Sequence, residues 1–168
     1  ASHEAIANVL VTVAKKEACQ CPIELAMKVS LHSERNLRRA LLMVESLKVQ
    51  MGSPQLQAAR TVPLPDWELY ICKMARDILQ EQSPSRLLHA REMMYELLTN
   101  CIPSDVILTT LSRELMKGLD DTLKHEVAHW IAYYEHRICS GSKDIFHLEA
   151  FVAKFMAGYK RWLMSIFF

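Results

Sequence analysis

Glycine is scarce in this sequence, and its few positions bear on the fold. Only four of the 168 residues are glycine: Gly52, Gly118, Gly141 and Gly158. Neither G-x-x-x-x-G-K-S/T nor G-x-G-x-x-G occurs, so the chain has no glycine-rich loop that could hold a phosphate. Glycine also supplies the tight turns of β-hairpins, whereas three of these four fall where a helix could end. We therefore expect an all-α fold.

Long apolar runs are missing as well. A membrane helix needs about 20 consecutive apolar residues, and the run from Trp162 to Phe168 is short and interrupted by Ser165. With 51% hydrophobic and 23% charged residues, the composition is that of a globular protein, and we expect no membrane partner. Because the chain starts at Ala1 and enters a helical pattern at once, we expect a fragment of a longer protein.

The cysteines do not form a disulfide framework. There are five, an odd number, and they lie among apolar residues: Cys19, Cys21, Cys72, Cys101 and Cys139. This pattern predicts buried free thiols in a reducing compartment, the cytosol or the nucleus. Cys19 and Cys21 form a C-x-C pair, which is a weak metal signal without further ligands.

Helical periodicity predicts three helices before residue 52. The first covers about residues 2 to 17, and the second runs from about Pro22 to Leu31. Ser33 is a suitable N-cap for the third, which Gly52 would end. In that third helix one face is expected to carry Leu37, Leu41, Val44 and Lys48.

Five more helices follow a linker at residues 52 to 64, which has prolines and no periodicity. Their predicted starts lie at Pro65, Ser83, Pro103, Asp120 and the residues after Gly141. Residues 1 to 51 carry seven Lys and Arg against five Asp and Glu, and residues 65 to 168 carry twelve against fourteen. Neither part is basic enough to indicate a nucleic-acid binder by charge alone.

One zinc-peptidase motif is present, His125-Glu126-Val127-Ala128-His129. On a helix, H-E-x-x-H places two imidazoles one turn apart with a glutamate to activate water, and Glu149 could be a third ligand. A pentapeptide with three fixed positions occurs by chance, and the chain lacks the strand that usually lines a peptidase cleft. We interpret the motif as a solvated helix face and predict no metal site.

An arginine cluster follows Ser33: Arg35, Arg38 and Arg39. Guanidinium groups suit phosphate oxygens, so the cluster is a candidate phosphate contact, with a merely solvated basic face as the alternative. A helix-turn-helix is another open alternative, with residues 22 to 31 positioning a recognition helix at residues 34 to 50.

The last two predicted helices hold more apolar residues than one core-facing stripe requires. A helix that is apolar on more than one face needs a second partner, and in a small bundle that partner could be another chain. We therefore predict a subunit interface carried by these residues: Tyr134, Phe146, Phe151, Phe155, Tyr159 and Trp162.

Six segments resemble the small subunits of eukaryotic replication factor C, the clamp loader, and most of all the subunit-three type. They are Val9 to Glu17, Arg35 to Met43, Asp66 to Glu68, Tyr95 to Pro103, Tyr133 to Arg137 and His147 to Met156. They lie in the family's order across nearly the whole chain. Residues 46 to 64 and those after Lys160 match poorly.

The resemblance implies a three-helix AAA+ lid at residues 1 to 51, then a five-helix collar at residues 65 to 168 that packs beside four sister subunits. It places Arg38 where the family carries its sensor-2 arginine, near the nucleotide phosphates. The resemblance also implies a full-length nuclear parent that acts in replication and repair. Its N-terminal part would bind ATP or ADP with Mg²⁺, the sliding clamp and primer–template DNA. With no P-loop, acidic Mg²⁺-binding strand or arginine finger, this chain is expected to have no catalytic residue and no cofactor of its own.

Overall fold

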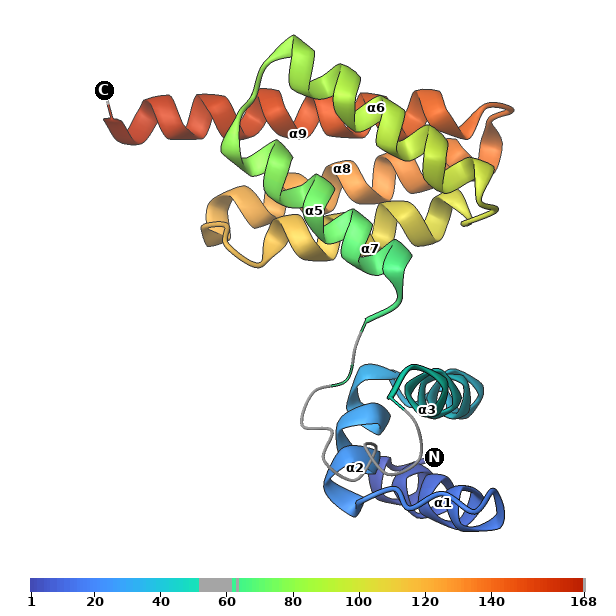
Figure 1. Cartoon of the computed structure of the whole chain (residues 1–168). Coiled ribbons are helices and arrows are strands. Elements are labelled where there is room, and N and C mark those ends of the chain that lie inside the picture. Colours follow the sequence, from blue (N-terminus) through green and yellow to red (C-terminus); the bar gives the residue numbers. More distant parts are fainter. Residues whose placement is uncertain (52–61, 63, 168) are drawn as a thin grey trace. The chain divides into compact units, whose positions relative to one another are not determined.

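The computed structural model describes residues 1–51, 62 and 64–167, which fall into two compact units, Ala1–Leu64 and Pro65–Phe168 (Figure 1). Within these described residues there are eight α-helices and no strand, three helices in the first unit and five in the second. The predicted all-α fold is therefore confirmed. The predicted linker at residues 52 to 64, including Gly52, lies outside the described residues except for Val62 and Leu64.

The N-terminal unit consists of α1 (His3–Lys16), α2 (Ile23–His32) and α3 (Leu37–Met51), and each helix packs against the other two. The Ser2 hydroxyl accepts a hydrogen bond from the amide of Ala5 at 3.2 Å and so caps α1. The core is built mainly from small and medium-sized side chains. They are Ile6, Ala7, Leu10, Ala14, Cys19, Cys21, Leu25, Ala26, Val29, Ala40, Met43 and Leu47.

The start of α3 differs from the prediction. Ser33 ends α2, where its hydroxyl donates to the Ser30 carbonyl at 2.9 Å. Asn36 is the N-cap of α3, because its side-chain oxygen accepts from the amide of Arg39 at 3.2 Å. Between them Glu34 and Arg35 have φ values of 51° and 65°. These two left-handed residues delay the helix by one turn beyond the predicted cap.

The face that α3 buries also differs from the prediction. Leu37 is 40% exposed, and the residues of α3 in the core are Ala40, Met43 and Leu47. Leu41, Val44 and Lys48 instead line a recess of about 580 Å³ against α1. The apolar stripe read from the sequence thus follows the edge of the core and not its centre.

The C-terminal unit contains α5 (Asp66–Gln80), α6 (Pro84–Thr99), α7 (Ser104–Met116), α8 (Asp121–Ser140) and α9 (Asp144–Phe167). Its helix starts agree with the predicted signals. Ser83 caps α6 through its hydroxyl, which accepts from the amide of Arg86 at 3.2 Å, and Asp120 caps α8. Pro65 and Pro103 occupy the N-cap positions of α5 and α7.

The five helices close a ring of contacts. In order around it, α5 packs on α7, α7 on α8, α8 on α9, α9 on α6, and α6 returns to α5. In Figure 1 the C-terminal part of α9 runs past the ends of the helices beside it. Phe151 and Val152 of α9 are fully buried among residues of the other helices. Helix α9 is therefore both a core element and the helix that reaches furthest from the bundle.

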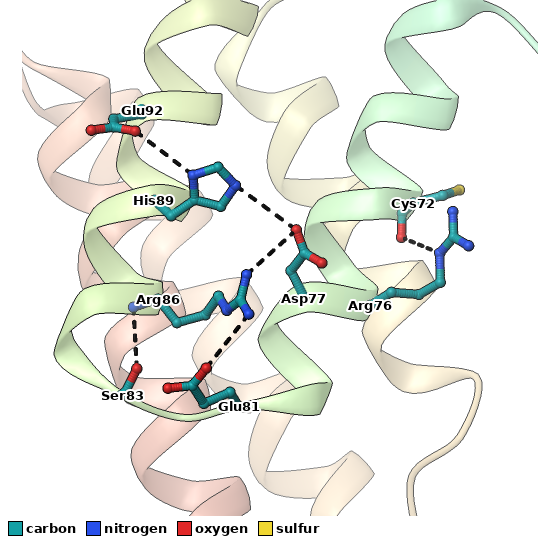
Figure 2. A network of polar contacts seen from close by, with 8 residues as sticks. All are labelled: Cys72, Arg76, Asp77, Glu81, Ser83, Arg86, His89 and Glu92. Atoms are coloured by element: carbon teal, nitrogen blue, oxygen red, sulfur yellow. Dashed lines mark hydrogen bonds and ion pairs between the residues drawn. The ribbon is translucent and has the colours of Figure 1, made fainter.

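Figure 2 shows a polar clasp where α5 turns into α6. Asp77 of α5 lies 4.0 Å from Arg86 and 3.9 Å from His89, both on α6. Arg86 also pairs with Glu81 in the connection at 3.5 Å. Partly exposed pairs of this kind are each worth at most about 1 kcal/mol, so they mainly fix the geometry of the turn.

Among the described residues, no helix is long and apolar enough to cross a membrane.

Candidate interaction surfaces

Arg38, the predicted phosphate contact, lies in the first turn of α3 with its side chain exposed. Within the described residues it makes no hydrogen bond or ion pair. The amides at a helix N-terminus carry partial positive charge, so an anion beside Arg38 would meet both the guanidinium and the helix end. The Asn36 cap and the left-handed Glu34 and Arg35 define the backbone from which Arg38 projects.

The three arginines of the predicted cluster have different surroundings. Arg35 donates from Nε to the backbone carbonyl of Ala1 at 2.8 Å, which ties the start of α3 to the start of α1. Arg39 is partly buried, while Arg38 is exposed. Arg38 is thus the member of the cluster whose exposed side chain lies in the first turn of α3, beside the helix end.

The predicted interface residues fall into two groups. Phe151 is fully buried and Phe155 is 3% exposed, and both belong to the core of the C-terminal unit. A partner could reach neither ring without opening the bundle. Helical periodicity cannot distinguish a core position from an interface position, whereas the burial of both side chains assigns them to the core. A contact with another chain would therefore have to use their exposed neighbours.

The other four predicted residues reach the surface. Tyr159 and Trp162 are partly buried and continue a stack from Phe155, with ring centroids 5.8 Å apart at each step. Tyr134 of α8 meets Phe151 edge-on at 6.2 Å, and burial raises the pKa of its phenol. Phe146 lies apart at the start of α9 and is 58% exposed.

Cations lie over several aromatic rings of α8 and α9, an arrangement that was not predicted from the sequence. The ammonium of Lys154 lies 4.4 Å from the centroid of Trp130, and Lys143 lies 5.6 Å from that of Phe146. Arg137 lies 5.9 Å from Tyr133. Cation–π contacts of this kind add roughly 0.5–1 kcal/mol each at exposed sites. The spacing of Tyr133 and Arg137 along one helix indicates their contact, whereas Trp130 and Lys154 lie on different helices.

We call the partly and fully exposed aromatic residues of α8 and α9 the α8–α9 surface: Trp130, Tyr133, Tyr134, Phe146, Tyr159 and Trp162. Tryptophan, tyrosine and arginine are the residues most enriched where binding energy concentrates at protein interfaces. The surface is therefore suited to another protein chain.

Glu126 of the H-E-x-x-H motif and the possible third ligand Glu149 both contact other side chains of the bundle. His125, Glu126 and His129 lie on the exposed face of α8. Glu126 accepts from Trp130 Nε1 and from Arg161 of α9, each at 3.4 Å, and so links the two helices. Glu149, the possible third ligand, forms a two-pronged ion pair with Arg91 of α6, one contact being 2.9 Å. No group of three or more His, Cys, Asp or Glu side chains in the described part of the chain could hold a metal.

Two families match the two units in the order of the chain. Residues 8–49 match the family described as "RCF1/5-like, AAA+ ATPase lid domain". Residues 67–163 match "Replication factor C subunit 3, C-terminal domain". The fold and the two matches thus define the class of protein: a small helical lid followed by a larger helical domain.

Individual relatives agree over almost the whole chain. It is 50% identical over 166 residues to replication factor C subunit 5 of Oryza sativa and 49% identical to subunit 3 of Arabidopsis thaliana, with 99% of the chain covered in both. It is 49% identical over 162 residues to subunit 3 of Homo sapiens. The chain belongs to the replication factor C subunit family. It spans 45–46% of the length of these relatives.

Proposed function

We propose that this chain is the non-catalytic C-terminal part of a clamp-loader subunit. Its larger unit would act as a collar that joins four sister subunits into a ring, and the N-terminal unit would act as the lid of an ATPase module. The assembled loader would use ATP and Mg²⁺, held mainly by the other half of the parent, to place a sliding clamp on primer–template DNA in the nucleus. The observation that carries this proposal is the order of the two family matches, with the lid family first and the family of C-terminal domains second.

The proposed contact with sister subunits is the α8–α9 surface. Large exposed aromatic side chains gain free energy when a partner covers them, because roughly 25 cal/mol is gained per Å² of apolar surface removed from water. Phe146 at 58% exposed is the most open of these rings, and Trp162 is a partly buried ring near the C-terminal end of α9. These two residues are the sharpest probes of the surface.

Co-purification with the sister subunits of the same organism tests the collar proposal. The double variant Phe146→Ala and Trp162→Ala should weaken association by about tenfold or more, as for residues at the centre of an interface. Leu69→Ala on α5 is the matched control, since Leu69 is 48% exposed and α5 packs on α6 and α7. Unchanged association by a folded double variant would contradict the proposal.

The proposed lid role rests on Arg38, which would contact a nucleotide phosphate in the full-length parent. Arg38→Ala in the full-length parent should weaken ATP binding by about tenfold, the scale of one lost charge-assisted hydrogen bond. Arg38→Lys keeps the charge without the planar fork and should recover part of the binding. Arg35→Ala is the control, because Arg35 is engaged with the Ala1 carbonyl. Equal binding by all variants would remove Arg38 from the nucleotide site.

A further inference from the structure

A second aromatic site lies at the other end of the α5–α6 pair from the polar clasp. The first turn of α5 and the last turn of α6 enclose a recess of about 480 Å³. Its lining consists of Asp66, Trp67, Tyr70, Glu96, Leu97, Asn100 and Ile102. Neither of the functions proposed above uses this recess.

The end of α6 gives the recess its apolar floor. Cys101 has a φ of 60°, and the amide of Ile102 donates to the Leu97 carbonyl at 3.1 Å, while that of Cys101 donates to Leu98 at 3.0 Å. This is a Schellman motif, which turns the chain back on the helix it ends. It brings Ile102 to the same recess as the buried Leu97. The floor is thus held by main-chain hydrogen bonds.

The polar groups in the recess are mostly hydrogen-bond acceptors. Asp66 and Glu96 are both exposed carboxylates. Glu96 accepts a hydrogen bond from the Tyr70 hydroxyl, and this bond raises the pKa of Tyr70 to about 12. Tyr70 therefore stays protonated as the donor and leaves the second Glu96 oxygen open. The Asn100 side-chain nitrogen donates to the Glu96 carbonyl at 2.9 Å, so its amide oxygen remains an acceptor.

The recess lacks a cation of its own. In the described part of the chain, neither Asp66 nor Glu96 pairs with a Lys, Arg or His side chain, although Asp77, Glu126 and Glu149 each do. The aromatic rings of the α8–α9 surface also differ from those of the recess, because cations lie over them: Lys154 over Trp130 and Arg137 over Tyr133. No cation of the described residues covers Trp67 or Tyr70.

We propose that this recess binds an arginine side chain of a partner protein. A guanidinium is planar, so it can lie against an aromatic ring and at the same time direct its N–H groups to carboxylate and amide oxygens. It carries five donors and no acceptor, which complements Asp66, Glu96 and the Asn100 oxygen. An ammonium has no such plane, and an uncharged aliphatic chain would leave both carboxylates without a partner. The inference concerns α5 and α6 and does not depend on the proposed ring contact.

Trp67 offers a direct readout once the other two tryptophans are replaced. In the whole chain carrying Trp130→Phe and Trp162→Phe, Trp67 is the remaining tryptophan. The probe is the peptide Gly-Arg-Gly, acetylated and amidated, with otherwise identical peptides that carry norleucine or lysine in place of arginine. Arginine should change the Trp67 emission with a dissociation constant of ~30–100 mM, the scale that one exposed cation–π contact and one exposed ion pair would give. Binding should weaken at least about threefold with added salt, because both carboxylates are exposed.

Two variants decide whether the recess is the site. Glu96→Gln retains an oxygen that accepts from Tyr70 but loses the charge, and with Asp66→Asn it should weaken arginine binding at least about fivefold. Glu135→Gln is the control, because Glu135 is an exposed carboxylate on α8, whereas the recess lies between α5 and α6. Melting temperatures would establish that all variants are folded. Equal binding of arginine and norleucine, equal binding of arginine and lysine, or no effect of the double variant would overturn the proposal.

Discussion

The two units solve the problem of helix packing with different side chains. Every Trp, Tyr and Phe of the chain lies after residue 64, so the N-terminal unit has no aromatic residue. Its core relies on alanines from all three helices, Ala7 and Ala14 of α1, Ala26 of α2 and Ala40 of α3. The core of the C-terminal unit is mostly leucine and isoleucine, joined by methionines and by Phe151 and Phe155, and Phe151 is its largest fully buried side chain.

This difference has consequences for stability and for partners. Small side chains let helices approach closely but bury little area, whereas each aromatic residue buries about 150–250 Å². An N-terminal unit of about 50 residues is near the lower limit for a domain that folds alone. The C-terminal unit has two phenylalanines in its core and further aromatic rings exposed or partly exposed on α8 and α9. We therefore expect the N-terminal unit to be the less stable and the C-terminal unit to carry most protein contacts.

The largest expected effect is on the C-terminal core. Phe151→Ala should lower the free energy of unfolding of this unit by about 3–5 kcal/mol, the loss typical of a buried phenylalanine. Near-ultraviolet circular dichroism reports only this unit, because all aromatic residues lie in it. The near-ultraviolet transition should therefore move to lower temperature.

The control for this prediction is Phe146→Ala, which removes a ring that is 58% exposed. That change should alter stability by no more than about 0.5 kcal/mol. Equal losses from Phe146 and Phe151 would mean that the core does not centre on Phe151.

The next effect should appear in the N-terminal unit alone. Leu25 of α2 is 2% exposed, and Leu25→Ala should cost about 2–4 kcal/mol, which is a large share of the stability of a small unit. Far-ultraviolet circular dichroism should lose part of its helical signal at lower temperature while the near-ultraviolet transition stays in place. Leu31→Ala on the same helix is the control, since Leu31 is 57% exposed. A shared shift of both transitions would show that the two units unfold together.

A smaller effect concerns two buried serines of the C-terminal unit. Within the described residues, the Ser112 hydroxyl is buried without a hydrogen-bond partner, whereas the Ser104 hydroxyl donates to Asp144 at 2.7 Å. A buried unsatisfied polar group costs about 1–3 kcal/mol, so Ser112→Ala should raise the stability by about 1 kcal/mol. Ser104→Ala should lower it by a similar amount. Urea unfolding of the two variants, followed at the aromatic signal, would compare them directly, and a loss in both would indicate that Ser112 has a partner after all.

Much of the fold could be predicted from residues that punctuate helices. Ser83-Pro84, Pro103 and Asp120 mark helix starts because each supplies a capping group or a suitable φ angle. The prediction failed at α3, where Ser33 and Asn36 are both good caps. The choice depends on the left-handed Glu34 and Arg35, and nothing in their residue types indicates that conformation.

Less of the candidate sites could be predicted, because they depend on contacts between helices. Periodicity identifies Phe151 and Tyr159 as apolar positions of one helix, but only packing shows that the first is buried and the second reaches the surface. The pairing of Lys154 with Trp130 joins two helices and leaves no pattern along the chain. The recess at α5 and α6 likewise combines residues about 30 positions apart, such as Trp67 and Glu96.

The scarcity of glycine leads to the prediction with the smallest expected effect, which can be tested in the same way in both units. Helices α1 and α6 both end in a Schellman motif with a left-handed residue that is not glycine, Ala18 with φ 51° and Cys101 with φ 60°. A left-handed conformation costs roughly 1–2 kcal/mol for an ordinary residue, and glycine escapes this cost but loses more backbone entropy on folding. Ala18→Gly and Cys101→Gly should therefore each stabilise their own unit by about 0.5–1 kcal/mol.

Lys16→Gly, inside α1, is the control and should destabilise the N-terminal unit by about 0.5–1 kcal/mol, because its backbone is helical. The far-ultraviolet transition of the N-terminal unit and the near-ultraviolet transition of the C-terminal unit separate the two gains. If Ala18→Gly stabilised and Cys101→Gly did not, the left-handed turn after α6 would be held by contacts in the recess, since the backbone cost is the same in both motifs. Equal gains would mean that the two units, so different in their cores, end these helices by the same local physics.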